Sequence, residues 1–227
     1  MQFAATYKEK EELNQYWYSA KTIEVRTVLA MVVVASHGVH LMRVCLLQYL
    51  AKEILRNNPS AVAFLSTPSL YYACEELQND AASTSTSKPT FVLFDYDVAL
   101  PRVVHYDFNH PTTFPDEFAH KFDFIVIDPP FITEHVWTKY AESARFLVAP
   151  GGKLLLTTIG TRRHRRLGGR FDTWIHIAEN KDMLATLLSC TLRRFQPSIP
   201  HLVYQYGTFA NYDSPALDAV NPEIPQD

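Results

Sequence analysis

The sequence predicts one α/β domain built around a central, mostly parallel β-sheet. Short apolar segments alternate with helical patterns along most of the 227 residues, and strands that alternate with helices form parallel sheets through right-handed crossovers. The length suffices for one domain of this kind and little more. Residues 122–127 form a nearly continuous apolar run, as expected for a central strand that is covered on both faces.

The chain leaves the sheet abruptly after this central strand. Asp128 is followed by Pro129 and Pro130, which lack the N–H group needed to extend the hydrogen-bond ladder, and then by Phe131. Ligands of open α/β sheets bind beyond the carboxyl ends of the strands. We therefore expect these four residues to form a rigid active-site loop.

Two earlier segments predict a nucleoside site at the same edge. Residues 61–65 form a first strand, and the helix that follows at 70–77 begins without a glycine-rich phosphate loop, in a chain of only 7 glycines. Residues 91–94 form a second strand that ends at Asp95 and Asp97. A carboxylate at this position suits the hydroxyls of a ribose, because it accepts two hydrogen bonds from a cis diol.

A third strand is expected at residues 103–106 and leads into Asp107. The Asp107 carboxylate either accepts a hydrogen bond from an adenine amino group or simply forms a turn. The remaining elements are expected as helices at 8–20, 22–35, 39–55, 133–147 and 180–190, a strand at 153–159, and a closing antiparallel hairpin of 191–197 and 202–212. Thr133 is the expected N-cap of the helix at 133–147. Residues 1–214 are expected to form the domain and 215–227 a disordered tail.

Composition excludes several classes of protein. The apolar fraction of 47%, the charged fraction of 20% and the net charge of -3 are typical of a soluble globular protein and argue against general nucleic-acid binding. Three scattered cysteines form no metal site and no disulfide framework, which indicates free thiols in a reducing, cytoplasmic location. The polar N-terminus is no signal peptide, and the apolar stretch 27–50 contains polar residues and reads as a core helix rather than a membrane span. The basic run 162–166 is either a solvated loop or a contact for an acidic partner or RNA.

The order of the segments, with Asp-Pro-Pro-Phe after the fourth strand, resembles class I S-adenosylmethionine-dependent methyltransferases. The Asp-Pro-Pro-[Phe/Tyr] loop is shared by adenine-N6, glutamine and lysine methyltransferases, and it indicates methyl transfer to a nitrogen atom. Much of the chain, from about residue 13 to residue 214, is similar to the elongation factor 1-alpha lysine methyltransferase 1 family. The similarity is carried by the segments 13–19, 64–71, 94–97, 106–111, 128–131 and 209–214.

This resemblance implies a Rossmann-like fold with a seven-stranded sheet flanked by helices, and a protein-lysine methyltransferase that acts on elongation factor 1-alpha. An adenine-N6 methyltransferase of nucleic acid and a non-catalytic binding module are the alternatives. The resemblance implies a catalytic loop of Asp128, Pro129, Pro130 and Phe131. It implies that S-adenosylmethionine is bound by Ser66, Thr67, Pro68 and Ser69, by Asp95 or Asp97 at the ribose, by Tyr106 or Asp107 near the adenine, and by Trp17, Tyr18 and Ser19 over the methionine end.

Overall fold

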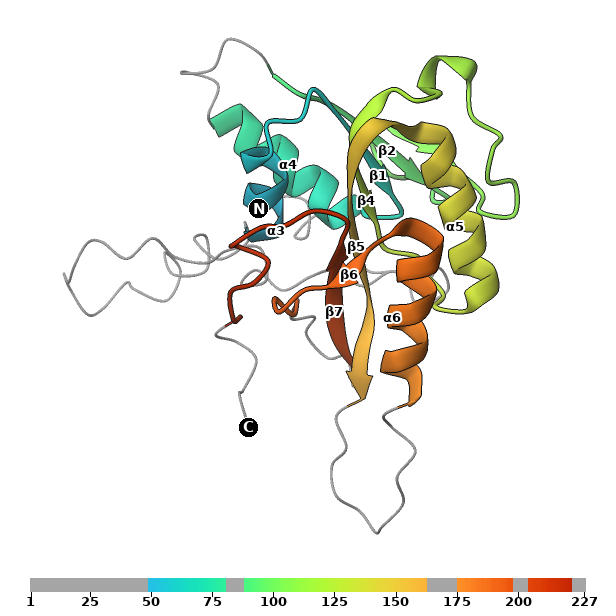
Figure 1. Ribbon diagram of the computed structural model, residues 1–227. Helices are drawn as coiled ribbons and strands as arrows, with labels where there is room; N and C mark the ends of the chain where they lie inside the picture. Colours follow the sequence, from blue (N-terminus) through green and yellow to red (C-terminus); the bar gives the residue numbers. More distant parts are fainter. Residues whose placement is uncertain (1–48, 81–87, 163–174, 198–203, 222–227) are drawn as a thin grey trace, which may run out of the picture.

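The computed structural model of the protein describes residues 49–80, 88–162, 175–197 and 204–221, with the side chains of 160–162, 175–179 and 204–205 left aside. A seven-stranded sheet forms the centre of this part (Figure 1). Its strands run in the order β3-β2-β1-β4-β5-β7-β6. Pairing is parallel from β3 to β5, and β7 is antiparallel to both β5 and β6. The prediction of a mostly parallel, seven-stranded, Rossmann-like sheet is confirmed.

The elements lie close to the predicted ones. The strands are β1 (Ala61–Leu65), β2 (Thr90–Asp95), β3 (Val103–His105), β4 (Phe122–Ile127), β5 (Val148–Arg162), β6 (Thr191–Leu192) and β7 (Tyr204–Ala210). The helices are α3 (Tyr49–Arg56), α4 (Pro68–Asp80), α5 (Glu134–Leu147) and α6 (Ile175–Leu188), with a 3-10 turn η2 at Asp116–Phe118.

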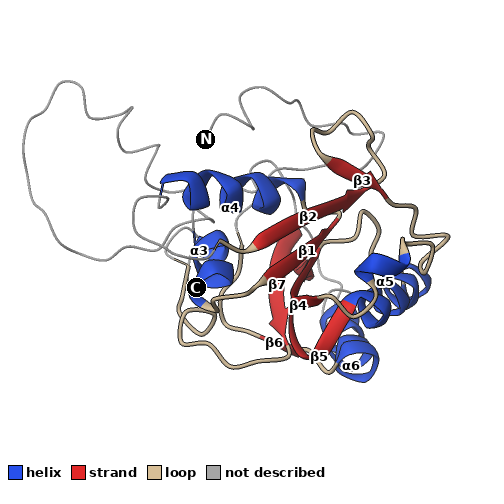
Figure 2. Cartoon of the chain, turned by 90° about the horizontal axis from the view of Figure 1, so that it is seen from above, coloured by secondary structure: helices blue, strands red, loops and turns tan. Residues whose placement is uncertain are grey.

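Helices cover both faces of the sheet, so the central strands are apolar throughout. The helices α3 and α4 lie on one face and α5 and α6 on the other, as both ribbon views show (Figures 1 and 2). All five residues of β1 are buried. Val62 and Phe64 belong to the core under α4, whereas Ala63 and Leu65 belong to the core under α5. This alternation explains why the apolar runs are unbroken rather than polar at every second position.

Several boundaries differ from the expected ones. The strand β5 spans Val148–Arg162 instead of 153–159, because it gains partners on both sides, with Phe122 paired to Val148 and Arg162 to Tyr204. The expected strand 191–197 is reduced to the two residues of β6. The lengths of these strands depend on pairing with segments that are distant in the sequence, and local propensity does not predict such pairing.

The chain after Ser214 does not match the expected disordered tail as far as Asn221. Leu217 is fully buried, and its carbonyl accepts a hydrogen bond from the N–H of Phe195 at 2.7 Å. The side chain of Asn221 is also buried and donates to the carbonyl of Gln196 at 2.8 Å. Composition suggested disorder, but tertiary contacts place this segment in the folded domain.

Some expectations lie outside the described residues. These are the helices predicted before residue 49, the apolar stretch 27–48, Cys45 and residues 163–166 of the basic run. Within the described ranges, no helix is long and apolar enough to cross a membrane. Cys74 and Cys190 are buried free thiols, as expected.

Candidate active site

Three neighbouring strand ends at one edge of the sheet bring predicted site residues together. Leu65 at the end of β1 pairs with Phe94 on one side and with Ile127 on the other. The residues that follow these strands therefore lie in one row, with Asp95, Ser66 and Asp128 side by side. Backbone hydrogen bonds continue the row, because Ser66 N–H donates to the Phe94 carbonyl at 2.8 Å and Asp128 N–H to the Leu65 carbonyl at 3.2 Å.

The row crosses the point where the strand order reverses. The chain goes from β1 outward to β2 and β3, and then returns to place β4 on the other side of β1. The loops after β1 and β4 consequently diverge, which opens the ligand-binding position of an α/β sheet. Ser66 follows β1 and Asp128 follows β4, so they fall on either side of this position; Figure 2 shows the strands β1 and β4 side by side.

The loop after β1 has two features that suit a bound ligand. Ser66 has a φ of 54°, in the left-handed region that a non-glycine residue seldom adopts. Thr67 is buried, and its Oγ1 has no hydrogen-bond partner among the described residues. A buried hydroxyl without a partner is costly, so a ligand that hydrogen-bonds to it would remove the penalty. Pro68 begins α4 and Ser69 lies in its first turn, both buried.

The acidic positions after β2 are both buried but differ in their surroundings. Oδ1 of Asp95 accepts a hydrogen bond from the N–H of Asp97 at 2.9 Å, and Oδ1 of Asp97 accepts from the N–H of Ala99 at 3.1 Å. Asp97 thus closes the turn, while Asp95 occupies the row of strand ends. Between them, Tyr96 is 59% exposed and tilted against His105, which leaves an aromatic face beside the acid.

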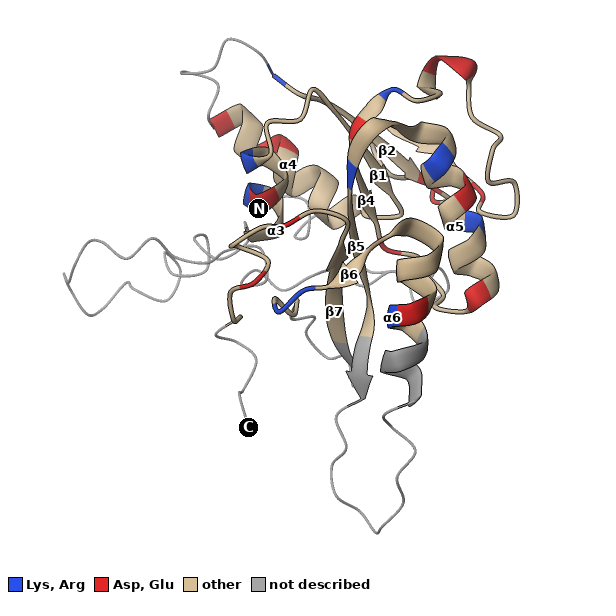
Figure 3. Cartoon of the chain, viewed as in Figure 1, with Lys and Arg blue, Asp and Glu red and all other residues tan. Residues whose placement is uncertain are grey.

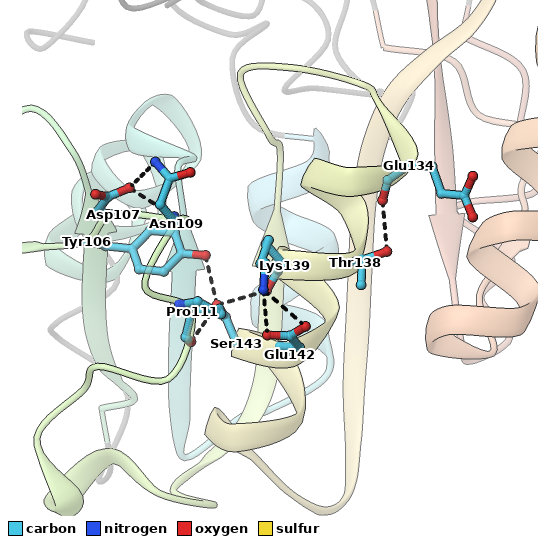
Figure 4. Close-up of polar contacts among 9 residues, drawn as sticks. All are labelled: Tyr106, Asp107, Asn109, Pro111, Glu134, Thr138, Lys139, Glu142 and Ser143. Atoms are coloured by element: carbon cyan, nitrogen blue, oxygen red, sulfur yellow. Dashed lines mark hydrogen bonds and ion pairs between the residues drawn. The ribbon is translucent and has the colours of Figure 1, made fainter.

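The residues after β3 make hydrogen bonds within the protein, and their expected place near the adenine stays a prediction. The Tyr106 ring is buried, and its hydroxyl lies 2.8 Å from Ser143 Oγ on α5, which in turn donates to the Pro111 carbonyl at 2.7 Å (Figure 4). Asp107 Oδ1 accepts from both the N–H and the side-chain amide of Asn109 (Figure 4). These hydrogen bonds lower the pKa of Asp107, with His110 contributing. Asp107 therefore forms a turn, and Tyr106 supports the site from the core.

Sequence reasoning missed the residue that joins these parts. Tyr140, on the buried face of α5, has its hydroxyl 2.6 Å from Ser66 Oγ. Burial raises the pKa of the Tyr140 phenol well above its usual value, and the neighbouring Tyr106, Asp95 and Asp128 raise it further, although the bond to Ser66 lowers it. Tyr140 therefore stays neutral, and the carboxylates at the ends of β2 and β4 both contribute to its raised pKa. In the sequence it matches the apolar period of a helix and reads as a core residue.

The loop after β4 joins the end of that strand to the start of α5, and its catalytic role stays a prediction. Pro129 is buried, Asp128 and Pro130 are half-buried, and Phe131 is 51% exposed. The helix α5 begins three residues later, where Thr133 Oγ1 accepts a hydrogen bond from the N–H of Val136, as predicted for its N-cap. A strand end, two prolines and a capped helix therefore fix the loop from both sides. Trp17, Tyr18 and Ser19 lie outside the described residues.

Comparison with known proteins identifies the family. The family model described as "Probable N6-adenine methyltransferase" matches residues 9–214. The chain belongs to this family. Proteins that are similar to the chain bear different names. EEF1A lysine methyltransferase 1 of Mus musculus is 26% identical over 213 residues, which cover 91% of this chain and 77% of the mouse protein. Protein-lysine N-methyltransferase M142.8 of Caenorhabditis elegans is 31% identical over 155 residues, which cover 66% of this chain and 62% of the nematode protein.

A solved structure of the glycopeptide N-methyltransferase MtfA complexed with S-adenosyl-L-methionine has a TM-score of 0.45 and 15% identity, and covers 71% of this chain and 92% of that one. The fold assignment rests on the strand order of this chain rather than on that likeness.

Proposed function

We propose that this protein transfers a methyl group from S-adenosylmethionine to the ε-amino group of a lysine in translation elongation factor 1-alpha. The observation that carries the proposal is the Asp-Pro-Pro-Phe loop at the carboxyl end of β4, in one row with Ser66 and Asp95. The names of the mouse and nematode relatives support a protein lysine as the acceptor.

We also propose a cytoplasmic location, which imaging of a tagged protein in cells would test.

The described residues fit S-adenosylmethionine. The buried Asp95 carboxylate suits the two hydroxyls of a ribose, and the unpartnered Thr67 Oγ1 suits a polar group of the ligand. The exposed Tyr96 ring offers a flat surface for the base. When bound, S-adenosylmethionine supplies an electrophilic methyl group on sulfur. Among the described residues, no cluster of His, Cys, Asp or Glu is arranged to hold a metal ion.

The protein's own contribution is to position a neutral amine. Methyl transfer needs the nitrogen lone pair in line with the methyl group, so the barrier is mainly one of orientation. The two prolines fix the loop backbone, and the Asp128 carboxylate and the loop carbonyls supply acceptors for the amine hydrogens. The exposed Phe131 ring supplies an apolar flank for the lysine stem.

Lysine must also lose its proton. With a pKa of about 10.4, roughly one lysine in a thousand is neutral near pH 7.4, which corresponds to about 4 kcal/mol. Desolvation beside Phe131 lowers the lysine pKa, and the Asp128 carboxylate is placed to accept the proton or to orient the amine. Two substitutions separate these roles. Asp128→Ala removes both, whereas Asp128→Asn keeps an acceptor oxygen but no base.

We expect Asp128→Ala to reduce methyl transfer at least a hundredfold, the usual loss for a positioned polar group, with S-adenosylmethionine affinity by calorimetry unchanged. Partial activity of Asp128→Asn indicates orientation, and loss equal to that of Asp128→Ala indicates a base. Asp116→Ala on η2, which removes an exposed carboxylate outside the site, is the matched control. Full activity of Asp128→Ala would remove this loop from the mechanism.

The family description favours a second acceptor, the N6 amino group of adenine. Against it stands the net charge of -3, which gives no general attraction for phosphates. Radiolabelled S-adenosylmethionine, offered with elongation factor 1-alpha and with DNA or RNA, distinguishes the two. Label in the elongation factor supports the lysine proposal, and label in nucleic acid alone overturns it.

A further inference from the structure

A continuous column of aromatic rings runs from the core to the catalytic loop. It begins at Phe114, which stacks on Tyr106 with 5.4 Å between ring centroids. Tyr106 meets the edge of Tyr140 at 5.5 Å, and Tyr140 stacks on Phe108 at 6.1 Å. Phe108 meets Phe131 at 6.4 Å in an edge arrangement, with an angle of 70° between the ring planes.

Exposure rises along this column in the direction of the loop. Phe114, Tyr106 and Tyr140 are buried, Phe108 is half-buried, and Phe131 is 51% exposed. An exposed phenylalanine on a loop samples several rotamers unless a neighbour restricts it. The prolines restrict the backbone that leads to Phe131 but not the χ angles of its side chain. In the described part of the chain, the ring that restricts them belongs to Phe108.

Hydrogen bonds hold the base of the column. Tyr140 is fixed at its hydroxyl by Ser66, and Tyr106 at its hydroxyl by Ser143, whose Oγ also bonds to Pro111 and Lys139 (Figure 4). Burial raises the pKa of both phenols, so these hydroxyls remain neutral hydrogen-bonding groups. A ring that stacks on Tyr140 therefore rests on a surface that does not shift with pH near neutrality.

We propose that Phe108 is a positioning residue of the methyl-transfer site, which holds the Phe131 ring in the orientation that receives the substrate lysine. This inference rests on the proposed lysine transfer for its kinetic consequence. Because the Phe131 ring is already restricted before binding, its side chain loses less conformational entropy when the protein substrate binds. Phe108 thereby sets the KM for that substrate without contacting the reacting atoms.

The substitution Phe108→Leu tests this, with Phe146→Leu as its matched control. Phe146 is also half-buried, but it stacks on Phe114 at the opposite end of the column, at 5.6 Å. We expect Phe108→Leu to raise the KM for the protein substrate about fivefold, with the S-adenosylmethionine Kd unchanged. We expect Phe146→Leu to lower the melting temperature alone, and Phe108→Tyr, which keeps the ring, to retain the wild-type KM. In the background of Phe131→Leu, Phe108→Leu should add little, because the ring that it holds is gone.

A readout independent of activity separates this inference from the proposed function. With 4-fluorophenylalanine at all 14 phenylalanines, the fluorine resonance that disappears in Phe131→Leu reports on Phe131. We expect it to shift and narrow in Phe108→Leu and to stay in place in Phe146→Leu. An unchanged resonance in Phe108→Leu, or a weaker S-adenosylmethionine affinity with an unchanged substrate KM, overturns the inference. A wild-type enzyme that labels no protein, but whose Phe131 resonance responds as expected, overturns the proposed function and leaves the positioning role standing.

Discussion

At the scale of the residue, Tyr140 shows how a buried side chain supports a loop of the site. Its hydroxyl holds Ser66 Oγ, and Ser66 has a left-handed backbone that is unfavourable without support. Because burial, together with Tyr106, Asp95 and Asp128, raises the Tyr140 pKa, the phenol cannot act as a base near neutral pH. Its contribution is therefore geometric.

The substitution Tyr140→Phe isolates that contribution. It removes one hydrogen bond, worth about 1 kcal/mol, while the ring stack remains. If the bond holds the β1 loop in its binding conformation, S-adenosylmethionine affinity falls about fivefold. Calorimetry measures this, with Tyr71→Phe as the control, because the Tyr71 hydroxyl bonds to Glu75 within α4. Equal affinities for wild type and Tyr140→Phe would show that Ser66 keeps its conformation unaided.

At the scale of the element, one carboxylate joins the starts of β1 and β4. Asp123 accepts hydrogen bonds from the N–H and Oγ of Ser60 and from the N–H of Ala61, at 2.8, 2.7 and 3.0 Å. Partial burial raises the pKa of Asp123, but these hydrogen bonds outweigh it and bring the pKa below the usual 3.8. A carboxyl with a depressed folded-state pKa stabilises the fold above its unfolded pKa, and this stability is lost as the pH falls through the folded value.

We expect Asp123→Ala to lower the free energy of unfolding by about 1–2 kcal/mol at pH 7. The gap between wild type and variant should narrow as the pH falls below about 4, because the wild-type carboxyl then becomes protonated. Urea unfolding at pH 7 and at pH 3 measures the difference in the free energy of unfolding between wild type and variant at each pH. The exposed Asp116→Ala should show no such difference at either pH. A gap that is the same at both pH values would assign the effect to packing instead of charge.

The elements also show which features a sequence predicts. The strands Ala61–Leu65 and Phe122–Ile127 and the Thr133 cap were predicted because their signals are local: apolar runs, prolines and a capping side chain. The row of Asp95, Ser66 and Asp128 was predictable in kind, because parallel strands end at one edge. The link from Tyr140 to Ser66 spans 74 residues and leaves no local pattern. The sequence also could not decide between the two interpretations of Asp107, a turn or a hydrogen bond to an adenine amino group. They differ only in the groups that surround the carboxylate, which the local sequence does not specify.

At the scale of the whole molecule, the C-terminal segment ties the first described helix to the far edge of the sheet. The Tyr49 hydroxyl on α3 donates to the Ala216 carbonyl, and the Tyr49 ring stacks on Phe195 at 4.3 Å. Phe195 follows β6, and its N–H bonds to Leu217. The segment around Leu217 therefore closes a core to which α3, α4 and the strands β1, β2, β4, β5 and β7 contribute.

Truncation of Leu217 measures how much of the fold depends on this closure. Leu217 is fully buried, so Leu217→Ala should leave a cavity and lower the free energy of unfolding by about 2–5 kcal/mol. The exposed Asp218→Ala next to it should change stability by less than about 0.5 kcal/mol. Chemical denaturation compares the two.

The C-terminal segment leaves the sheet at the end opposite to the site. Asn211, which follows the antiparallel β7, donates to the Gly152 carbonyl near the start of β5. At temperatures where Leu217→Ala stays folded, its KM for the protein substrate should therefore equal that of wild type. A raised KM in the folded variant would mean that the closure also shapes the catalytic edge.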